Sequence, residues 1–216
     1  MWWGMSDVAS PSDEKEQAAD TPGARQTRRA LLVTAIAGCA CLATGRTANA
    51  DDDQPGSDER PQKDDVFVVT DGPQAGQVIK PSDLKQGGPP VHVWPKDPKT
   101  SVVRSGSRLN EIILVRLDPA ELDDDTRPHA AEGILAYSAI CSHAGCPVTE
   151  WVKGEGNGKT VLKCPCHNSE YDPRANAEVV FGPAPRRLAA LPLAVSGDTL
   201  TVAGSFVGKV GVSQQG

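Results

Sequence analysis

The sequence is poor in aromatic residues, which make up only 4% of its 216 residues, whereas it contains 21 Gly and 18 Pro. This balance disfavours a helical bundle and favours a turn-rich β protein. Positive charge is also scarce, because 22 Lys and Arg stand against 28 Asp and Glu, for a net charge of −6. That deficit argues against a nucleic-acid partner. An acidic surface could instead attract a basic protein partner.

A long hydrophobic run is likewise missing. The most apolar stretch, residues 30–44, is about 15 residues long, which is short of the ~20 that span a bilayer as a helix. It follows Thr27-Arg28-Arg29, which resembles a twin-arginine signature, and it precedes a small-x-small cleavage pattern at Ala48-Asn49-Ala50. Residues 1–50 are therefore expected to be an export signal that delivers a folded protein to the periplasmic side of the cytoplasmic membrane. Two alternatives stay open: an uncleaved membrane anchor, and lipidation at Cys39.

The rest of the chain divides by composition. Residues 51–65 are rich in Asp with interspersed Pro and Gly, and we expect an acidic, solvated linker there. Residues 66–216 are expected to form one folded domain of short strands separated by turns. The polar segment 118–129 should hold a helical turn. The fold class is all-β and antiparallel, with strands expected at 66–70, 76–80, 91–94, 112–117, 134–140, 148–152, 160–162, 178–181, 188–195 and 199–203.

Cysteine and histidine are few, six and four residues, yet four of the cysteines and two of the histidines fall between positions 141 and 167. One loop reads Cys141-Ser-His143-Ala-Gly-Cys146, and a second reads Cys164-Pro-Cys166-His167-Asn-Ser. The expected strand 134–140 delivers the first loop at its end, where a rigid sheet can fix ligand geometry. A flexible hairpin between the loops would bring them together in space.

This donor set admits more than one kind of site. A cluster with two inequivalent irons needs two thiolates on one iron and two imidazoles on the other, which raises its reduction potential above that of an all-cysteine cluster. Two cysteines then remain, and they could form a disulfide in an oxidising compartment. A closed zinc site is the alternative, but four ligands suffice for zinc, and the usual Cys-x-x-Cys spacing is absent. A site of free thiols or disulfides alone leaves the two histidines without a role.

Both loops together resemble the Rieske [2Fe-2S] motif, Cys-x-His-x-Gly-Cys followed by Cys-x-Cys-His-x-Ser. The resemblance implies a stacked-sheet fold with a small cluster-binding subdomain at about residues 138–185. It implies one [2Fe-2S] cluster per chain, with Cys141 and Cys164 on the inner iron and His143 and His167 on the outer iron. It also implies a disulfide between Cys146 and Cys166.

Residues around the ligands carry finer implications of the same resemblance. The hydroxyls of Ser169 and Tyr171 would donate to the cluster sulfurs and stabilise the reduced form. The loop Gly182-Pro183-Ala184-Pro185 matches the proline-rich loop that covers the cluster in quinol-oxidising complexes. The sequence departs from the common pattern at two positions. Ala144 replaces a larger apolar residue, which leaves the cluster less shielded, and Asn168 replaces a glycine, which could tighten or re-aim the second loop.

The resulting functional hypothesis is a high-potential one-electron carrier without catalytic residues of its own. We expect it to be a subunit of a larger cell-envelope oxidoreductase, quinol-oxidising and of the cytochrome bc type, with a c-type cytochrome or similar acceptor. The alternative is the small subunit of a periplasmic molybdenum enzyme such as arsenite oxidase, which the short apolar run and the cleavage site favour. A zinc-stabilised binding module is the alternative from another class.

Overall fold

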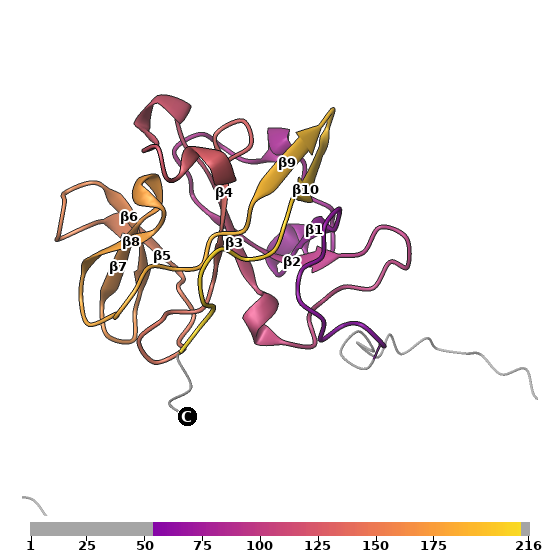
Figure 1. The fold of residues 1–216 in the computed structure, drawn as a ribbon, viewed down its shortest axis with the longest axis horizontal. Helices are drawn as coiled ribbons and strands as arrows, with labels where there is room; N and C mark the ends of the chain where they lie inside the picture. Colours follow the sequence, from indigo (N-terminus) through magenta and orange to yellow (C-terminus); the bar gives the residue numbers. More distant parts are fainter. Residues whose placement is uncertain (1–53, 213–216) are drawn as a thin grey trace, which may run out of the picture. The chain divides into compact units, whose positions relative to one another are not determined.

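The computed structural model describes residues 54–212 (Figure 1). The expected export signal, its cleavage site and Cys39 lie outside the described residues. Within 54–212 the helices are short 3-10 turns, and none has the length and apolar character that a membrane span requires. These turns are η1 Gly72–Gln74, η2 Pro81–Asp83, η3 Arg108–Asn110, η4 Pro119–Glu121, η5 Arg127–His129 and η6 Pro173–Ala175.

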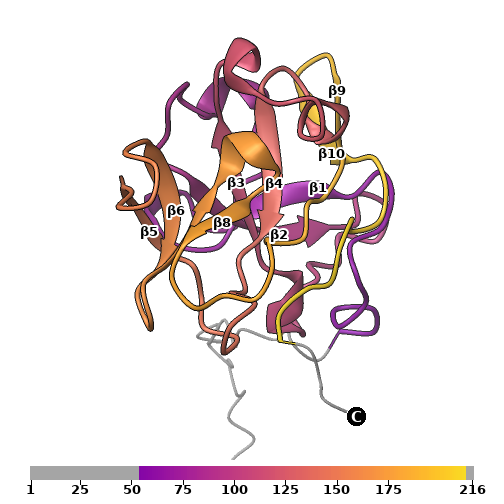
Figure 2. The same cartoon turned by 60° about the vertical axis from the view of Figure 1, so that its left-hand side comes forward.

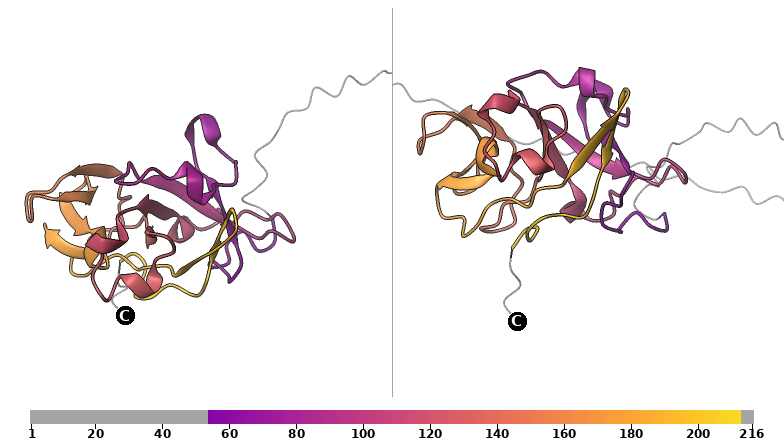
Figure 3. Two further views of the ribbon diagram at one scale, coloured as in Figure 1. Left: turned by 90° about the horizontal axis from the view of Figure 1, so that it is seen from above. Right: turned by 45° about the horizontal axis from the view of Figure 1, so that its top comes forward.

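Two antiparallel sheets form the fold, which confirms the all-β expectation. The larger sheet has six strands in the order β4-β3-β2-β1-β10-β9. The smaller has four strands in the order β5-β6-β7-β8, all from the chain between β4 and β9. Figures 1 and 3 show the smaller sheet, in orange, to one side of the larger. The strands are β1 Val66–Val69, β2 Val91–Lys96, β3 Ile112–Arg116, β4 Ile134–Ser138, β5 Glu150–Lys153, β6 Thr160–Cys164, β7 Ser169–Asp172, β8 Glu178–Phe181, β9 Leu193–Ser196 and β10 Thr199–Val202.

Strands β3 and β4 are buried on both faces and connect two hydrophobic cores. On β3, Ile113 and Val115 belong to a core that includes Leu162 and Tyr171 of the smaller sheet. The alternate residues of β3 instead join a second core, within the larger sheet, together with Phe67. Successive side chains of a strand point to opposite faces. A strand that contacts a core on each face therefore needs a continuous run of apolar residues. The strand that leads to the first ligand loop is thus held from both sides. Figure 2 shows β3 and β4, which belong to the larger sheet, next to β6 and β8 of the smaller sheet.

Two expected strands differ from the structure. Residues 76–80 form only an isolated pairing of Val78 with Val68, because the chain turns at Gly76, with φ of 76°, and enters η2 at Pro81. Of the strand expected at 188–195, only its end is found in β9, and Ala190 forms isolated pairings instead. Strand β7 was not expected, because its sequence, Ser-Glu-Tyr-Asp, is too polar to indicate a strand.

The expectation of a solvated linker at residues 51–65 is wrong for the C-terminal part of that segment. Asp65 is buried and accepts from Nε of Arg104 at 2.6 Å. The backbone carbonyl of Glu59 accepts from the amide of Asn110 at 2.7 Å, and the Glu59 carboxylate lies 2.9 Å from Arg104. A buried ion pair with a partner 39 residues away overrides the local composition, so the folded part begins before Val66.

Candidate metal centre

The first ligand loop follows β4 and closes on itself. The backbone N–H of Cys141 donates to the carbonyl of Cys146 at 2.8 Å, and that of Gly145 donates to the carbonyl of Cys141 at 3.0 Å. The guanidinium of Arg108 donates to the carbonyl of Gly145 at 2.9 Å. The hydroxyl of Ser142 donates to the carbonyl of Arg186 at 2.6 Å. The loop is therefore braced from two distant segments, and nothing in its local sequence indicated either brace.

The second ligand loop is the turn between β6 and β7, where Cys164 pairs with Ser169. Asn168 ends this turn with a left-handed backbone, φ 58°. Glycine adopts this conformation without strain, and asparagine is among the side chains that tolerate it best. The departure from glycine at this position is thus compatible with a tight loop.

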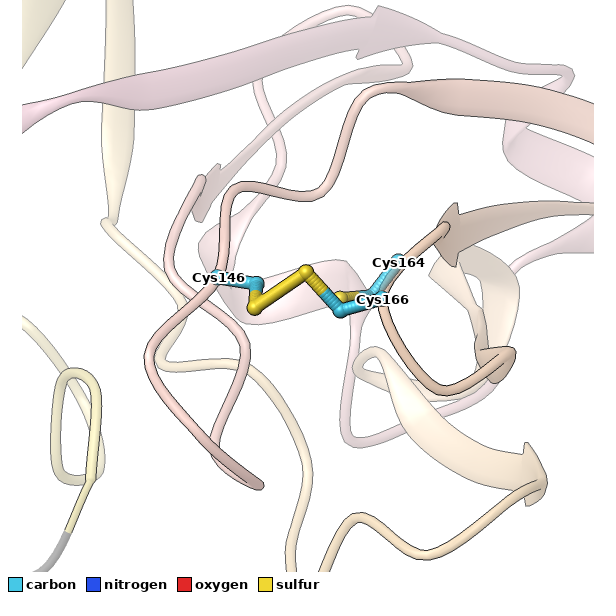
Figure 4. A group of neighbouring side chains, drawn as sticks. All are labelled: Cys146, Cys164 and Cys166. Carbon is cyan, nitrogen blue, oxygen red and sulfur yellow. A yellow bond between two sulfur atoms is a disulfide. The ribbon is translucent and has the colours of Figure 1, made fainter.

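A disulfide between Cys146 and Cys166 joins the two loops across a sequence separation of 20 residues, with Cα atoms 6.5 Å apart (Figure 4). Cys164 lies beside it, and the sulfurs of these three cysteines lie within 4.8 Å of one another. Two of these sulfurs share the disulfide bond and cannot act as thiolates. Of these three residues, the bridge therefore leaves only Cys164 as a candidate metal ligand.

The remaining thiols of the two loops are buried and free of disulfides, at Cys141 and Cys164. Burial raises the pKa of the Cys164 thiol, and the nearby Cys141 adds to that rise, while the backbone N–H of Cys166 opposes it. Such thiols are inert unless a cation is bound beside them, because a metal ion deprotonates a coordinating thiol. The pair is suited to metal binding and unsuited to nucleophilic chemistry.

The two histidines of the loops lie in contact, with ring centroids 4.6 Å apart and the rings nearly perpendicular. His143 is half-buried and His167 is exposed. The Nδ1 atom of His143 is buried and has no hydrogen-bond partner among the described residues. A buried polar atom without a partner is costly, and a neutral ring nitrogen is a common metal ligand. The donor set thus fits a group that binds two thiolates and two imidazoles.

Two hydroxyls lie around these donors. The Tyr171 hydroxyl lies 3.1 Å from the sulfur of Cys141. Burial, and then the Cys141 thiol, raises the pKa of Tyr171, so its hydroxyl remains a donor. The Ser169 oxygen is fully buried and has no partner among the described residues. The Tyr171 hydroxyl therefore contacts a candidate ligand sulfur, and Ser169, which pairs with Cys164 across β6 and β7, keeps an unused donor.

The proline-rich loop lies close to the second ligand loop. Gly182 has φ of 88°, and a side chain there would come within 2.6 Å of the Ser169 Cα atom. This close approach requires glycine. Pro183 and Ala144 are both exposed, so each loop presents a small or rigid apolar residue at the surface.

Comparison with known proteins agrees with this geometry. A family model for the Rieske [2Fe-2S] domain matches residues 76–192, which is more than half of the chain. The chain belongs to this family, whose domain binds a [2Fe-2S] cluster.

Two similar proteins have names that place them in respiratory complexes. The cytochrome bc1 complex Rieske iron-sulfur subunit of Mycobacterium tuberculosis is 34% identical over 149 residues, which cover 62% of this chain and 34% of that protein. A putative respiratory nitrate reductase subunit Rieske of Haloferax mediterranei is 38% identical over 110 residues, which cover 50% of this chain and 47% of that protein. The chain thus spans about a third and about half of these relatives. Among solved structures, the ferredoxin of carbazole 1,9a-dioxygenase from Nocardioides aromaticivorans aligns with a TM-score of 0.39 at 20% identity, covering 68% of this chain and 99% of that one.

Proposed function

We propose that Cys141 and Cys164 hold one iron of the [2Fe-2S] cluster and that His143 and His167 hold the other. The observation that carries this assignment is the division of six donors into two sets. One set forms the disulfide, and the other comprises two buried free thiols and two touching imidazoles. The disulfide between Cys146 and Cys166 keeps the two loops in register when either loop fluctuates.

The function that this site supports best is one-electron transfer. When bound, a cluster with two imidazole ligands supplies a redox couple of higher potential than an all-cysteine cluster. The chain would favour the reduced form further by donating the Tyr171 hydroxyl to the Cys141 sulfur, which lies 3.1 Å away. We assign the same role to the buried Ser169 hydroxyl, which has no partner among the described residues. His167 is the exposed imidazole, so we assign to it the contact with the redox partner.

The physiological setting that we propose is a cell-envelope oxidoreductase of the quinol-oxidising cytochrome bc type, reached by twin-arginine export. The protein would act on its periplasmic side, either membrane-anchored or soluble. The name of the Mycobacterium relative and the loop Gly182-Pro183-Ala184-Pro185 support this role. In it, the ring of His167 would accept a hydrogen bond from the quinol, and a c-type cytochrome or similar protein would take the electron.

A second setting is supported by a different observation. The Haloferax relative is named as a subunit of a nitrate reductase, and the apolar run 30–44 is short and precedes a cleavage pattern. Both favour an exported electron-transfer subunit of a terminal reductase or oxidase, such as a periplasmic molybdenum enzyme of the arsenite oxidase kind.

Purification of the native protein with its partners separates these settings. Retention in the membrane together with a cytochrome b subunit, and an uncleaved N-terminus, supports the quinol-oxidising complex. A chain cleaved after Ala50 that copurifies with a molybdopterin subunit supports the second setting. A purified protein that contains zinc but neither iron nor acid-labile sulfide would refute the electron-transfer function.

A further inference from the structure

Strand β7 presents two chemically different faces. Ser169 and Tyr171, on one face, are the buried hydroxyl residues of the metal centre. Glu170 and Asp172 alternate with them and point to the opposite face, where both are buried as well. A strand of four residues thus places two hydroxyls toward the cluster and two carboxylates away from it.

The Glu170 carboxylate is fully buried and binds the tip of the β5–β6 hairpin. Its Oε2 atom accepts from the backbone N–H of Glu155 at 2.8 Å and from that of Gly156 at 3.4 Å. Its Oε1 atom lies 3.6 Å from the ammonium of Lys163, the residue that pairs with Glu170 across β6 and β7. A buried carboxylate is costly unless it is paired and hydrogen-bonded, so Glu170 depends on the two backbone N–H groups of the hairpin tip and on the Lys163 ammonium.

The hairpin tip is packed closely against β7 and β8. A side chain at Gly154 would come within 3.1 Å of Oε2 of Glu170, and one at Gly156 would come within 2.1 Å of the carbonyl oxygen of Val180 on β8. The amide of Asn157 adds a second attachment by donating to the carboxylate of Asp172 at 2.8 Å. The tip, residues 154–158, therefore covers the face of β7 that lies opposite the hydroxyls.

We propose that Glu170 is a positioning residue for the cluster: it clamps residues 154–158 onto β7 and thereby holds the hydroxyls of Ser169 and Tyr171 at the cluster sulfurs. The proposal rests on the one-electron function proposed above. Hydrogen-bond donors aimed at cluster sulfurs stabilise the reduced form, so loosening β7 lowers the reduction potential. The loss of a nearby negative charge acts in the opposite direction, because the reduced cluster is the more negative one.

These opposite signs define the test, a redox titration of the full-length holoprotein with the Glu170→Ala and Glu170→Gln variants. We expect Glu170→Ala to lower the midpoint potential, because it removes the clamp. Glu170→Gln keeps an acceptor for the Glu155 N–H and should hold the potential at or above the wild-type value. A potential of Glu170→Ala equal to or above that of the wild type, or equal shifts in both variants, overturns the proposal.

Three further measurements keep the test specific. Glu155→Gln is the matched control, because it removes a carboxylate 4.0 Å from Lys163 but leaves the clamped backbone N–H, and it should not lower the potential. Amide hydrogen exchange at residues 155 and 156 should accelerate in Glu170→Ala and not in Glu170→Gln. In a Tyr171→Phe background the fall caused by Glu170→Ala should shrink, because part of that fall acts through the Tyr171 hydroxyl. An undiminished fall contradicts the mechanism.

If Glu170→Ala fails to fold, Glu170→Asp replaces it. The shorter side chain keeps the negative charge but withdraws the carboxylate from the N–H groups of Glu155 and Gly156. A lowered potential supports the clamp, and an unchanged potential overturns it. Iron and acid-labile sulfide in the wild-type protein are measured first. Their absence refutes the proposed function, whereas a loaded wild type with unresponsive variants refutes the clamp alone.

Discussion

Replacement of Tyr171 by phenylalanine tests the tuning of the cluster by a single atom. The hydroxyl lies 3.1 Å from the sulfur of Cys141, and the side chain is fully buried, so no water replaces the lost donor. One hydrogen bond contributes about 1 kcal/mol. For a one-electron couple, a tenfold change in the equilibrium constant corresponds to roughly 59 mV, so ~1 kcal/mol corresponds to roughly 40 mV. We expect the midpoint potential of the variant to fall by tens of millivolts in a redox titration followed by circular dichroism.

The chain contains its own matched control, because it has two tyrosines. The Tyr137 hydroxyl is also buried, but it donates to the carbonyl of Pro173 at 2.8 Å. Tyr137→Phe removes the same atom and should lower the free energy of unfolding while leaving the potential unchanged. An unchanged potential in Tyr171→Phe with an intact cluster, or equal falls in both variants, would refute the reasoning.

Four other outcomes follow from the same structure. His143→Ala should abolish the electron paramagnetic resonance signal of the reduced cluster, and a persisting signal would show that another ligand binds that iron. Cys146→Ser opens a disulfide with a separation of 20 residues and should lower the free energy of unfolding by about 3 kcal/mol in urea denaturation; a loss below ~1 kcal/mol would speak against a stabilising bridge. Asp65→Ala leaves the buried Arg104 guanidinium with the exposed Glu59 carboxylate as its remaining ionic partner, and thermal unfolding should show a free energy of unfolding lowered by about 3 kcal/mol; a neutral effect would place residues 54–65 outside the folded unit. Burial raises the pKa of Tyr137, so the stability it contributes is complete below the unfolded pKa of about 10 and is lost at higher pH. Urea titrations above that pH should show a flatter decline in Tyr137→Phe than in the wild type.

The candidate ligand window could be identified from the sequence because its donor residues lie close together in the chain. The four donors and the two bridging cysteines all lie between positions 141 and 167, at spacings that only a few chemistries use. The strands that surround the window were also accessible where their apolar residues form continuous runs, as in β3 and β4. A run that is apolar at every position predicts a strand buried on both faces, and these strands are so buried.

The features that escaped prediction depend on contacts between distant residues. The composition around Asp65 indicated a solvated segment, but Asp65 is buried because it accepts a hydrogen bond from the distant Arg104 side chain. The polar sequence of β7 did not indicate a strand. Its two carboxylates are buried because they accept hydrogen bonds from the tip of the β5–β6 hairpin. The brace that Arg108 applies to the first ligand loop spans 37 residues. No local pattern encodes such pairings, because each depends on the fold that brings the partners together.

The measurement that bears most directly on the central claim is nitrogen electron–nuclear double resonance on the reduced, full-length protein, combined with iron and sulfide analysis. We predict a [2Fe-2S] cluster with two imidazole nitrogens coupled to one iron, and the loss of one coupling each in His143→Ala and His167→Ala. A cluster without nitrogen couplings, or a protein that contains zinc and no sulfide, would contradict the assignment of these loops.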